Sequence, residues 1–315
     1  MTKERAMVPR AEPRSYYGQP VLKQPVWTPE VPLYFYAGGM SGASAGLALL
    51  AGVRGNKELE RRAWISALAG LAASPPLLIS DLGRPERFLN MLRMFKVTSP
   101  MSVGSWILSA YGGATTLAAG SELTGLFPLP GRLAKVASAA LGLPLATYTA
   151  GLLANTSVPA WQGARHTLPL VFASSSAASA GAAATITTPP RYAAPARRLA
   201  IGGALASVAS ALVMERALGD AGEPYSKGTS GKLKLAAGGL SLTGAALVAA
   251  RGSRSRAAAM GGGALITAGV IAERFAVFRA GFQSAADPKY TVGPQRLRIE
   301  QREARGAARK AQPVS

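Results

Sequence analysis

Eight apolar segments, each about long enough to cross a membrane, constrain the fold of this chain more than any other feature. A helix needs about 20 apolar residues to cross the ~30 Å hydrocarbon core of a bilayer. The segments that hydropathy indicates are residues 31–53, 63–80, 102–119, 133–154, 168–187, 199–217, 233–250 and 257–278. The sequence therefore predicts an all-α integral membrane protein with eight transmembrane helices.

Composition agrees with this class. Hydrophobic residues make up 49% of the chain and charged residues 16%, whereas soluble domains hold about 25% charged residues. The net charge of +20 is concentrated at the chain ends and in the connectors, so it faces water, anionic lipid or an acidic partner. Nucleic acid is not the expected partner, because a nucleic-acid groove interleaves basic residues with aromatic ones.

The chain has no Cys and a single His. Iron–sulfur clusters need several thiolates and a b-type haem usually needs two His ligands. We therefore expect no cluster, no haem and no metal site in this chain. Any electrons that it handles must belong to a bound organic carrier or to a partner protein.

Both ends of the chain are polar. Residues 1–30 are rich in Pro and predict an extended arm, without the pattern of a cleaved signal peptide, so the first span is expected to act as the insertion signal. Residues 281–315 form a basic tail that, from Asp287 onward, predicts either a short surface helix or disorder. The tails give their side of the membrane an excess of Lys and Arg, which favours a cytoplasmic location for both ends.

Two features bear on helix packing. Pro75 and Pro76 interrupt the second span, although neighbouring helices can satisfy the freed carbonyl groups in a membrane. Gly38, Gly42 and Gly46 recur at every fourth residue on one face of the first span. That spacing is typical of close helix packing, and room for a flat ligand is the alternative interpretation.

A charged, Pro-containing segment, DLGRPERFLNMLRMFKVTSPMSVGSW, lies at residues 81–106 between the second and third spans. It predicts an ordered docking element at the membrane surface. Residues 81–88 and 98–106 resemble the second connector and third span of the NrfD / polysulfide-reductase membrane-subunit family. The resemblance extends more loosely to Trp27 with Tyr34 before this segment and to residues 148–161 after it.

The resemblance implies two four-helix bundles, here residues 31–154 and 155–280. It also implies a quinone, menaquinone or ubiquinone, bound in the first bundle. The partners that it implies are a four-cluster iron–sulfur subunit and, commonly, a molybdopterin catalytic subunit. A quinone-contacting Tyr of the family matches Tyr148, whereas Tyr34 stands where some members have His.

Quinone chemistry suggests which residues form the site. A quinone that gains two electrons and two protons needs a hydrogen-bond donor at a carbonyl oxygen and a titratable relay. We expect Trp27, Glu30, Tyr34 and Tyr148 to converge near the face that carries the 81–106 segment. The two tyrosines are the candidate donors, and Glu30 or Asp81 the candidate proton carrier.

Several of these residues have simpler interpretations. Trp27 and Tyr34 suit an interfacial aromatic belt. Asp81 is expected to pair with Arg84 on the surface, and with Arg87 these residues are the candidate docking contacts for the partner.

Three residues outside this segment are further candidates. Glu215 and Glu273, each followed by Arg, are alternative proton relays, although we favour an interfacial position for both pairs. His166 is expected in a loop.

The favoured function is a quinone-binding electron-transfer subunit of a membrane oxidoreductase, with no catalytic centre of its own. A purely structural anchor and a proton-translocating module of the same complex are the alternatives. The expected location is the cell membrane, with the partner on the cytoplasmic side. The substrate of the partner and the direction of electron flow are not encoded in this chain.

Overall fold

The computed structural model describes residues 20–311, and helices account for its regular structure over that range. The long helices are α1 (Glu30–Val53), α2 (Lys57–Ser80), α3 (Pro100–Thr124), α4 (Pro128–Ala154), α6 (Leu168–Thr187), α7 (Ala194–Leu218), α9 (Gly228–Arg251), α10 (Arg256–Ala286) and α11 (Lys289–Ala311). Four short helical pieces, η1 (Pro85–Leu92), α5 (Pro159–Gly163), η2 (Gly219–Gly222) and α8 (Glu223–Ser226), lie in the connections. The predicted all-α class is confirmed.

Seven helical stretches within residues 20–311 are long and apolar enough to cross a membrane. The predicted third span, α3, is 25 residues long but does not reach that hydropathy, because Ser105, Thr115 and Glu122 are among the polar residues along it. The chain is therefore a multi-pass membrane protein. The eighth span stays a prediction.

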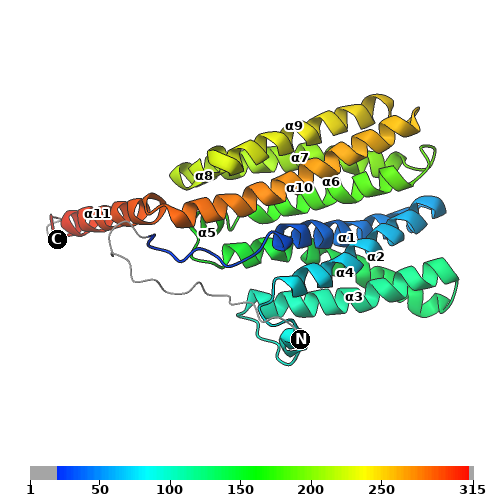
Figure 1. The fold of residues 1–315 in the computed structure, drawn as a ribbon, viewed down its shortest axis with the longest axis horizontal. Coiled ribbons are helices and arrows are strands. Elements are labelled where there is room, and N and C mark those ends of the chain that lie inside the picture. The colour runs from blue at the N-terminus through cyan, green and yellow to red at the C-terminus, as the bar shows by residue number, and fades with distance from the viewer. Residues whose placement is uncertain (1–19, 312–315) are drawn as a thin grey trace.

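Successive long helices from α1 to α10 run in opposite directions, so their connections gather at two ends (Figure 1). One end, called here the connector end, holds residues 20–29, the long connection 81–99 (the connector), α5, α8 and α11. The other, called the turn end, holds the short turns between α1 and α2, α3 and α4, α6 and α7, and α9 and α10.

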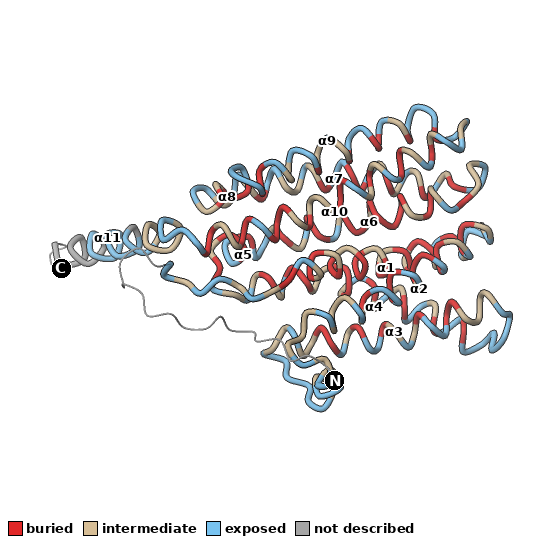
Figure 2. Tube along the Cα trace, in the orientation of Figure 1, coloured by how far each residue is buried: buried red, intermediate tan, exposed pale blue. Residues whose placement is uncertain are grey.

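Helices α1 to α4 pack on one another, and α6, α7, α9 and α10 do the same. The two sets meet mainly where α1 faces α6. Buried residues concentrate on the facing sides of the helices, and the outer sides are exposed (Figure 2). An apolar exterior is stable only in lipid, so this distribution fits a membrane protein.

Local signals explain where α2 begins and why it continues. The Asn56 side chain accepts a hydrogen bond from the Leu59 amide (3.2 Å), which caps the helix six residues before the predicted span. Pro75 and Pro76 lie inside α2, and the helix continues past them to Ser80. The prolines therefore do not end the second span.

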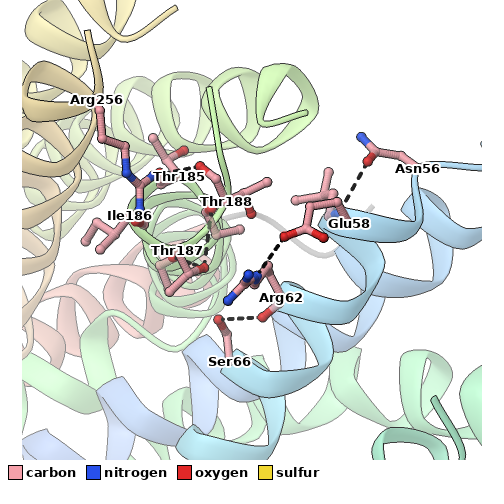
Figure 3. A network of polar contacts seen from close by, with 12 residues as sticks. Asn56, Glu58, Arg62, Ser66, Thr185, Ile186, Thr187, Thr188 and Arg256 are labelled. Atoms are coloured by element: carbon pink, nitrogen blue, oxygen red, sulfur yellow. Dashed lines mark hydrogen bonds and ion pairs between the residues drawn. The ribbon is translucent and has the colours of Figure 1, made fainter. Parts of the chain in front are cut away.

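Polar contacts tie the turn end together (Figure 3). The Arg256 guanidinium, at the start of α10, donates to the Thr188 carbonyl (2.7 Å) and to the Ile186 carbonyl. These carbonyls close α6, where a helix leaves its last acceptors unsatisfied. The Asn56 amide donates to the Tyr192 carbonyl (2.9 Å), so the turn before α2 is bonded to the turn before α7.

Glycines allow α1 and α4 to touch. A Cβ on Gly42 would lie 2.4 Å from the Gly142 carbonyl oxygen, and a Cβ on Gly142 would lie equally close to the Gly42 oxygen. Real Cβ atoms do not approach so closely, so this crossing requires two glycines. The packing interpretation of the glycine pattern thus holds at Gly42.

The last helix resolves the two expectations for the basic tail. Residues from Lys289 form α11, which projects from the connector end (Figure 1). Lys289 Nζ donates to Glu223 (2.5 Å), and this bond raises the pKa of the lysine. The greater part of the predicted N-terminal arm, residues 1–30, lies outside the described residues. Residues 20–29 have no regular secondary structure, and Glu30 already begins α1.

Candidate functional site

Two tyrosines meet inside the first set of helices. Tyr34 comes from the second turn of α1 and Tyr148 from the last third of α4. Their hydroxyl groups are hydrogen-bonded to each other, and either oxygen can be the donor. The sequence named both residues as donors, and the structure brings them together although 114 positions separate them.

A glycine of the connector motif makes room for this pair. A Cβ on Gly104, in the first turns of α3, would lie 2.1 Å from Cε2 of Tyr148. The ring of Tyr148 therefore packs directly on the α3 backbone. Sequence reasoning quoted Gly104 within the motif but gave it no role, because the ring that it accommodates comes from another helix.

One hydroxyl hydrogen of the Tyr34 and Tyr148 pair remains available for a further acceptor. Two hydroxyl groups carry two hydrogens, and one of these is used between Tyr34 and Tyr148. Neither hydroxyl has another recorded hydrogen bond among residues 20–311. The second hydrogen is thus available to a carbonyl oxygen that approaches the pair in an apolar environment, where such a bond is strong.

Thr28 and Asp81 fix the arm to the connector. The Asp81 carboxylate accepts hydrogen bonds from the backbone amide of Thr28 (2.8 Å) and from its hydroxyl (2.7 Å). Thr28 is buried. Asp81 therefore anchors the chain just before α1, a role that the expected pairing with Arg84 did not include.

Replacing Asp81 with Ala is expected to release the arm. Charge-assisted hydrogen bonds contribute about 1.5–3 kcal/mol each, and both are lost. We expect faster trypsin cleavage after the exposed Lys23 in the purified protein, followed by mass spectrometry. Glu86→Ala, which removes an exposed carboxylate from η1, is the matched control, and equal cleavage rates in the two variants would show that Asp81 does not hold the arm.

Trp27 lies at the connector end and packs against the core cluster that contains Tyr34. Its ring stacks on Trp161 of α5, with centroids 5.4 Å apart. Trp161 is buried and donates from Nε1 to the Val277 carbonyl (2.8 Å). Trp27 therefore joins the arm to α5 and α10.

Glu30 begins α1, one helical turn before Tyr34.

The connector is ordered by the motif residues that follow it. Ser102 donates to the Met94 carbonyl (3.0 Å) and accepts from the Lys96 amide (3.1 Å). The indole of Trp106 donates to the same Met94 carbonyl (3.3 Å) and contacts the Phe95 ring edge-on. The first turns of α3 thus hold the connector in one conformation.

The outer surface of the connector carries both basic and large apolar side chains. Arg84 and Arg87 are exposed, and the Arg87 amide donates to the Arg84 carbonyl (3.0 Å) within η1. Large apolar side chains beside them are also exposed, namely Leu89, Met94, Phe95 and Val97. Exposed apolar residues rimmed by charge are typical of a protein interface or a membrane contact.

The two Glu-Arg pairs occupy different environments. Glu215 forms an ion pair with Lys234 (2.7 Å), and its side chain is 15% exposed. Arg274 is buried at 1% exposure, over the Phe172 ring (3.7 Å), and donates to the Phe172 carbonyl (3.1 Å). Glu273 accepts from Ser207. The second pair is therefore interior, because α6 and α7 supply polar partners at that depth.

A cavity of about 290 Å³ lies among α7, α9 and α10 and does not include the tyrosine pair. Its lining is mostly apolar, with Glu215, Lys234 and Glu273 as its charged members. Leu212, Leu235 and Leu242 line it and are also exposed on the described chain. A lipid chain can fill such a cavity, so its size alone does not identify a functional site.

His166 is exposed in the loop between α5 and α6, where it was expected.

The membrane helices agree with what comparison with protein families finds. A model of an NrfD-type family, described as polysulfide reductase, matches residues 14–286. The chain belongs to this family. Membership indicates a membrane subunit of a redox complex. A search of curated proteins finds no match.

Proposed function

We propose that this protein is the quinone-binding, membrane-anchoring subunit of an oxidoreductase complex. The observation that carries the proposal is the hydrogen-bonded pair of buried Tyr34 and half-buried Tyr148, near the connector end of the membrane helices. The proposed architecture has eight spans in two four-helix bundles. The separate packing of α1 to α4 and of α6, α7, α9 and α10 supports it.

The donor chemistry at the pair fits a quinone. A quinone head group presents two carbonyl oxygens and no donor, and the tyrosine pair has one hydroxyl hydrogen to give. Bound quinone supplies reversible two-electron, two-proton redox chemistry that no side chain of this protein can supply. The tyrosines hold the head group by a hydrogen bond and retain a proton at the oxygen until it is transferred.

The electron partner docks, in this proposal, on the connector. Electrons must come from or go to a redox cofactor of another subunit, since the chain contains no Cys and one His. An iron–sulfur subunit attached to a molybdopterin catalytic subunit is the partner that we propose. The exposed Arg84 and Arg87, together with the apolar side chains beside them, offer that subunit a surface at the end where the tyrosines lie.

The test is quinone-analogue binding to the purified native complex. We expect one analogue per complex, measured by tryptophan fluorescence quenching or calorimetry, and competition by quinone. Replacing both tyrosines, Tyr34→Phe with Tyr148→Phe, should weaken analogue binding about tenfold, because a hydrogen bond to the ligand contributes about 1 kcal/mol or more.

The control is Tyr192→Phe, the same change at a half-exposed tyrosine of the turn end. Native affinity in the double variant would remove the tyrosine pair from the site. A complex that binds no analogue at all would instead favour a purely structural anchor.

A further inference from the structure

The cavity of about 290 Å³ among α7, α9 and α10 belongs to a groove on the outer side of the second helix set. α7 packs mainly on α6, and α9 packs mainly on α10, so α7 and α9 leave a gap between them. Leu212 of α7 and Leu235 of α9 line the cavity and are exposed. A molecule in the bilayer can therefore enter this groove, called here the α7–α9 groove, from the side.

Two glycines keep the α7–α9 groove open. Gly238 and Gly239 of α9 line the cavity, and a Cβ on either would have no neighbouring atom within 4 Å. At Gly244 of the same helix, by contrast, a Cβ would lie 2.6 Å from the Gly262 carbonyl oxygen of α10. Packing within the described chain thus requires Gly244 but neither Gly238 nor Gly239. Glycine is unfavourable in a helix, so these two glycines support an occupant that lies against α9.

The inner wall of the groove is apolar. Val208, Ala211 and Val277 are among the residues that line it. Glu273 also lines it, but Ser207 donates to one oxygen of its carboxylate, and the other oxygen is covered by protein. The cavity is at the small end of ligand pockets, which measure about 300–1,000 Å³. An apolar space of this size and shape suits a segment of one acyl chain.

An ion pair lies where the groove approaches the connector end. Glu215, in the last turn of α7, and Lys234, in the second turn of α9, both line the cavity. The Lys234 ammonium donates to Glu215 (2.7 Å), and the two side chains are 28% and 15% exposed. Side chains at the ends of membrane helices reach the layer of lipid head groups. The head group of a lipid whose chain fills the groove would therefore meet this ion pair.

The ion pair has bonding capacity left on both partners. An ammonium group has three hydrogens, and Lys234 directs one to Glu215 and one to the Ser226 hydroxyl (3.4 Å). Both bonds that Glu215 accepts, from Lys234 and from Ser226, reach Oε2. Over residues 20–311, one hydrogen of Lys234 and the Oε1 atom of Glu215 thus have no recorded partner. A head group that carries an anion and a cationic donor matches them.

We propose that the α7–α9 groove binds one phospholipid of the phosphatidylethanolamine type. Its acyl chain fills the cavity, its phosphate accepts a hydrogen bond from Lys234, and its ammonium group donates to Glu215. Both are charge-assisted hydrogen bonds. Phosphatidylcholine has the same charges but no N–H donor, and phosphatidylglycerol has no cation for Glu215. The bound lipid joins α7 to α9 in the second helix set, so this site does not depend on the proposed quinone site.

The test measures lipid binding to the purified native complex. The complex is stripped of lipid in detergent and titrated with phosphatidylethanolamine, phosphatidylcholine or phosphatidylglycerol of identical acyl chains, and native mass spectrometry counts the bound lipid. We expect one phosphatidylethanolamine to bind about tenfold more tightly than phosphatidylcholine, which lacks the hydrogen bond to Glu215. Equal affinity for these two lipids, or tighter binding of phosphatidylglycerol, would overturn the proposal.

Gly238→Leu tests the groove by filling it from α9. The complex should then bind one phosphatidylethanolamine fewer than the native complex. Its thermal stability in detergent should not fall, because Leu favours a helix over Gly. Gly202→Leu is the matched control, since Gly202 is an exposed residue of α7 that does not line the cavity, and a Cβ there also has no neighbouring atom within 4 Å. A native lipid count in Gly238→Leu would show that the groove holds no lipid.

Glu215→Gln tests recognition of the head group. It removes the charge that attracts the ammonium group, so the preference for phosphatidylethanolamine over phosphatidylcholine should fall from about tenfold to about threefold or less. Asp220→Asn, at an exposed carboxylate of η2, should keep the full preference. A full preference in Glu215→Gln would reject the assigned contact. Quinone-analogue affinity should stay native in Gly238→Leu, so failure of the lipid site and failure of the quinone site are observed separately.

Discussion

Tyr148→Phe is expected to reduce quinone-linked turnover about 100-fold, the size typical of losing a positioned proton donor. The ring stays, so its packing on Gly104 is unchanged. The Tyr34 hydroxyl, buried at 2% exposure, loses its recorded partner. The measurement is turnover of the assembled complex with quinone, compared with turnover using a soluble dye that exchanges electrons with the partner subunits directly.

The dye reaction controls for assembly. It should remain native in Tyr148→Phe, because the chemistry of the partner does not pass through the tyrosine. Tyr192→Phe at the turn end should retain both activities. If Tyr148→Phe keeps its quinone-linked rate, the tyrosine pair is structural, and the quinone lies elsewhere in the complex.

Gly104→Ala is the second change with a large expected effect. The new methyl group would lie 2.1 Å from Cε2 and 2.8 Å from Cδ2 of Tyr148, so the ring must move and its hydroxyl must leave Tyr34. Overpacking of this kind costs about 1–3 kcal/mol, partly offset by the ~1 kcal/mol by which Ala favours a helix over Gly. We expect quinone-linked turnover to fall at least about tenfold and thermal stability to decrease.

Gly113→Ala is the matched control for this change. Gly113 lies on the same helix, and a Cβ there would have no atom within 4 Å. It should be neutral or slightly stabilising, in both thermal unfolding and quinone-linked turnover. A Gly104→Ala complex with native turnover would show that the position of the Tyr148 ring is not critical.

The sequence predicted the helices well because lipid imposes a single requirement on them, an apolar segment of sufficient length. Their ends were less predictable. Asn56 begins α2 six residues early through a side-chain cap, and α10 continues to Ala286, eight residues beyond the predicted span. Charged residues at these ends lower hydropathy without interrupting the helix.

The contacts of the candidate site were only partly predictable. Chemistry selected Tyr34 and Tyr148 as donors, but hydropathy carries no information on which faces of α1 and α4 meet. Trp27 was grouped with the tyrosines because of its position in the chain, and Trp161, which holds it, was given no role. Arg274 was predicted to lie near the interface. Its burial could not be predicted from the sequence, because its stabilising partners, the Phe172 ring and carbonyl, come from another helix.

The two ends of the helix set differ in how firmly they are tied. At the turn end, the link between α1 and α2 and the link between α3 and α4 are three residues each, and the Arg256 and Asn56 contacts add cross-links. At the other end, the connector spans residues 81–99. The short links at the turn end prevent the helices from sliding past one another. Any adjustment to a docked partner must therefore change the distances between helices at the connector end, while the turn end stays fixed.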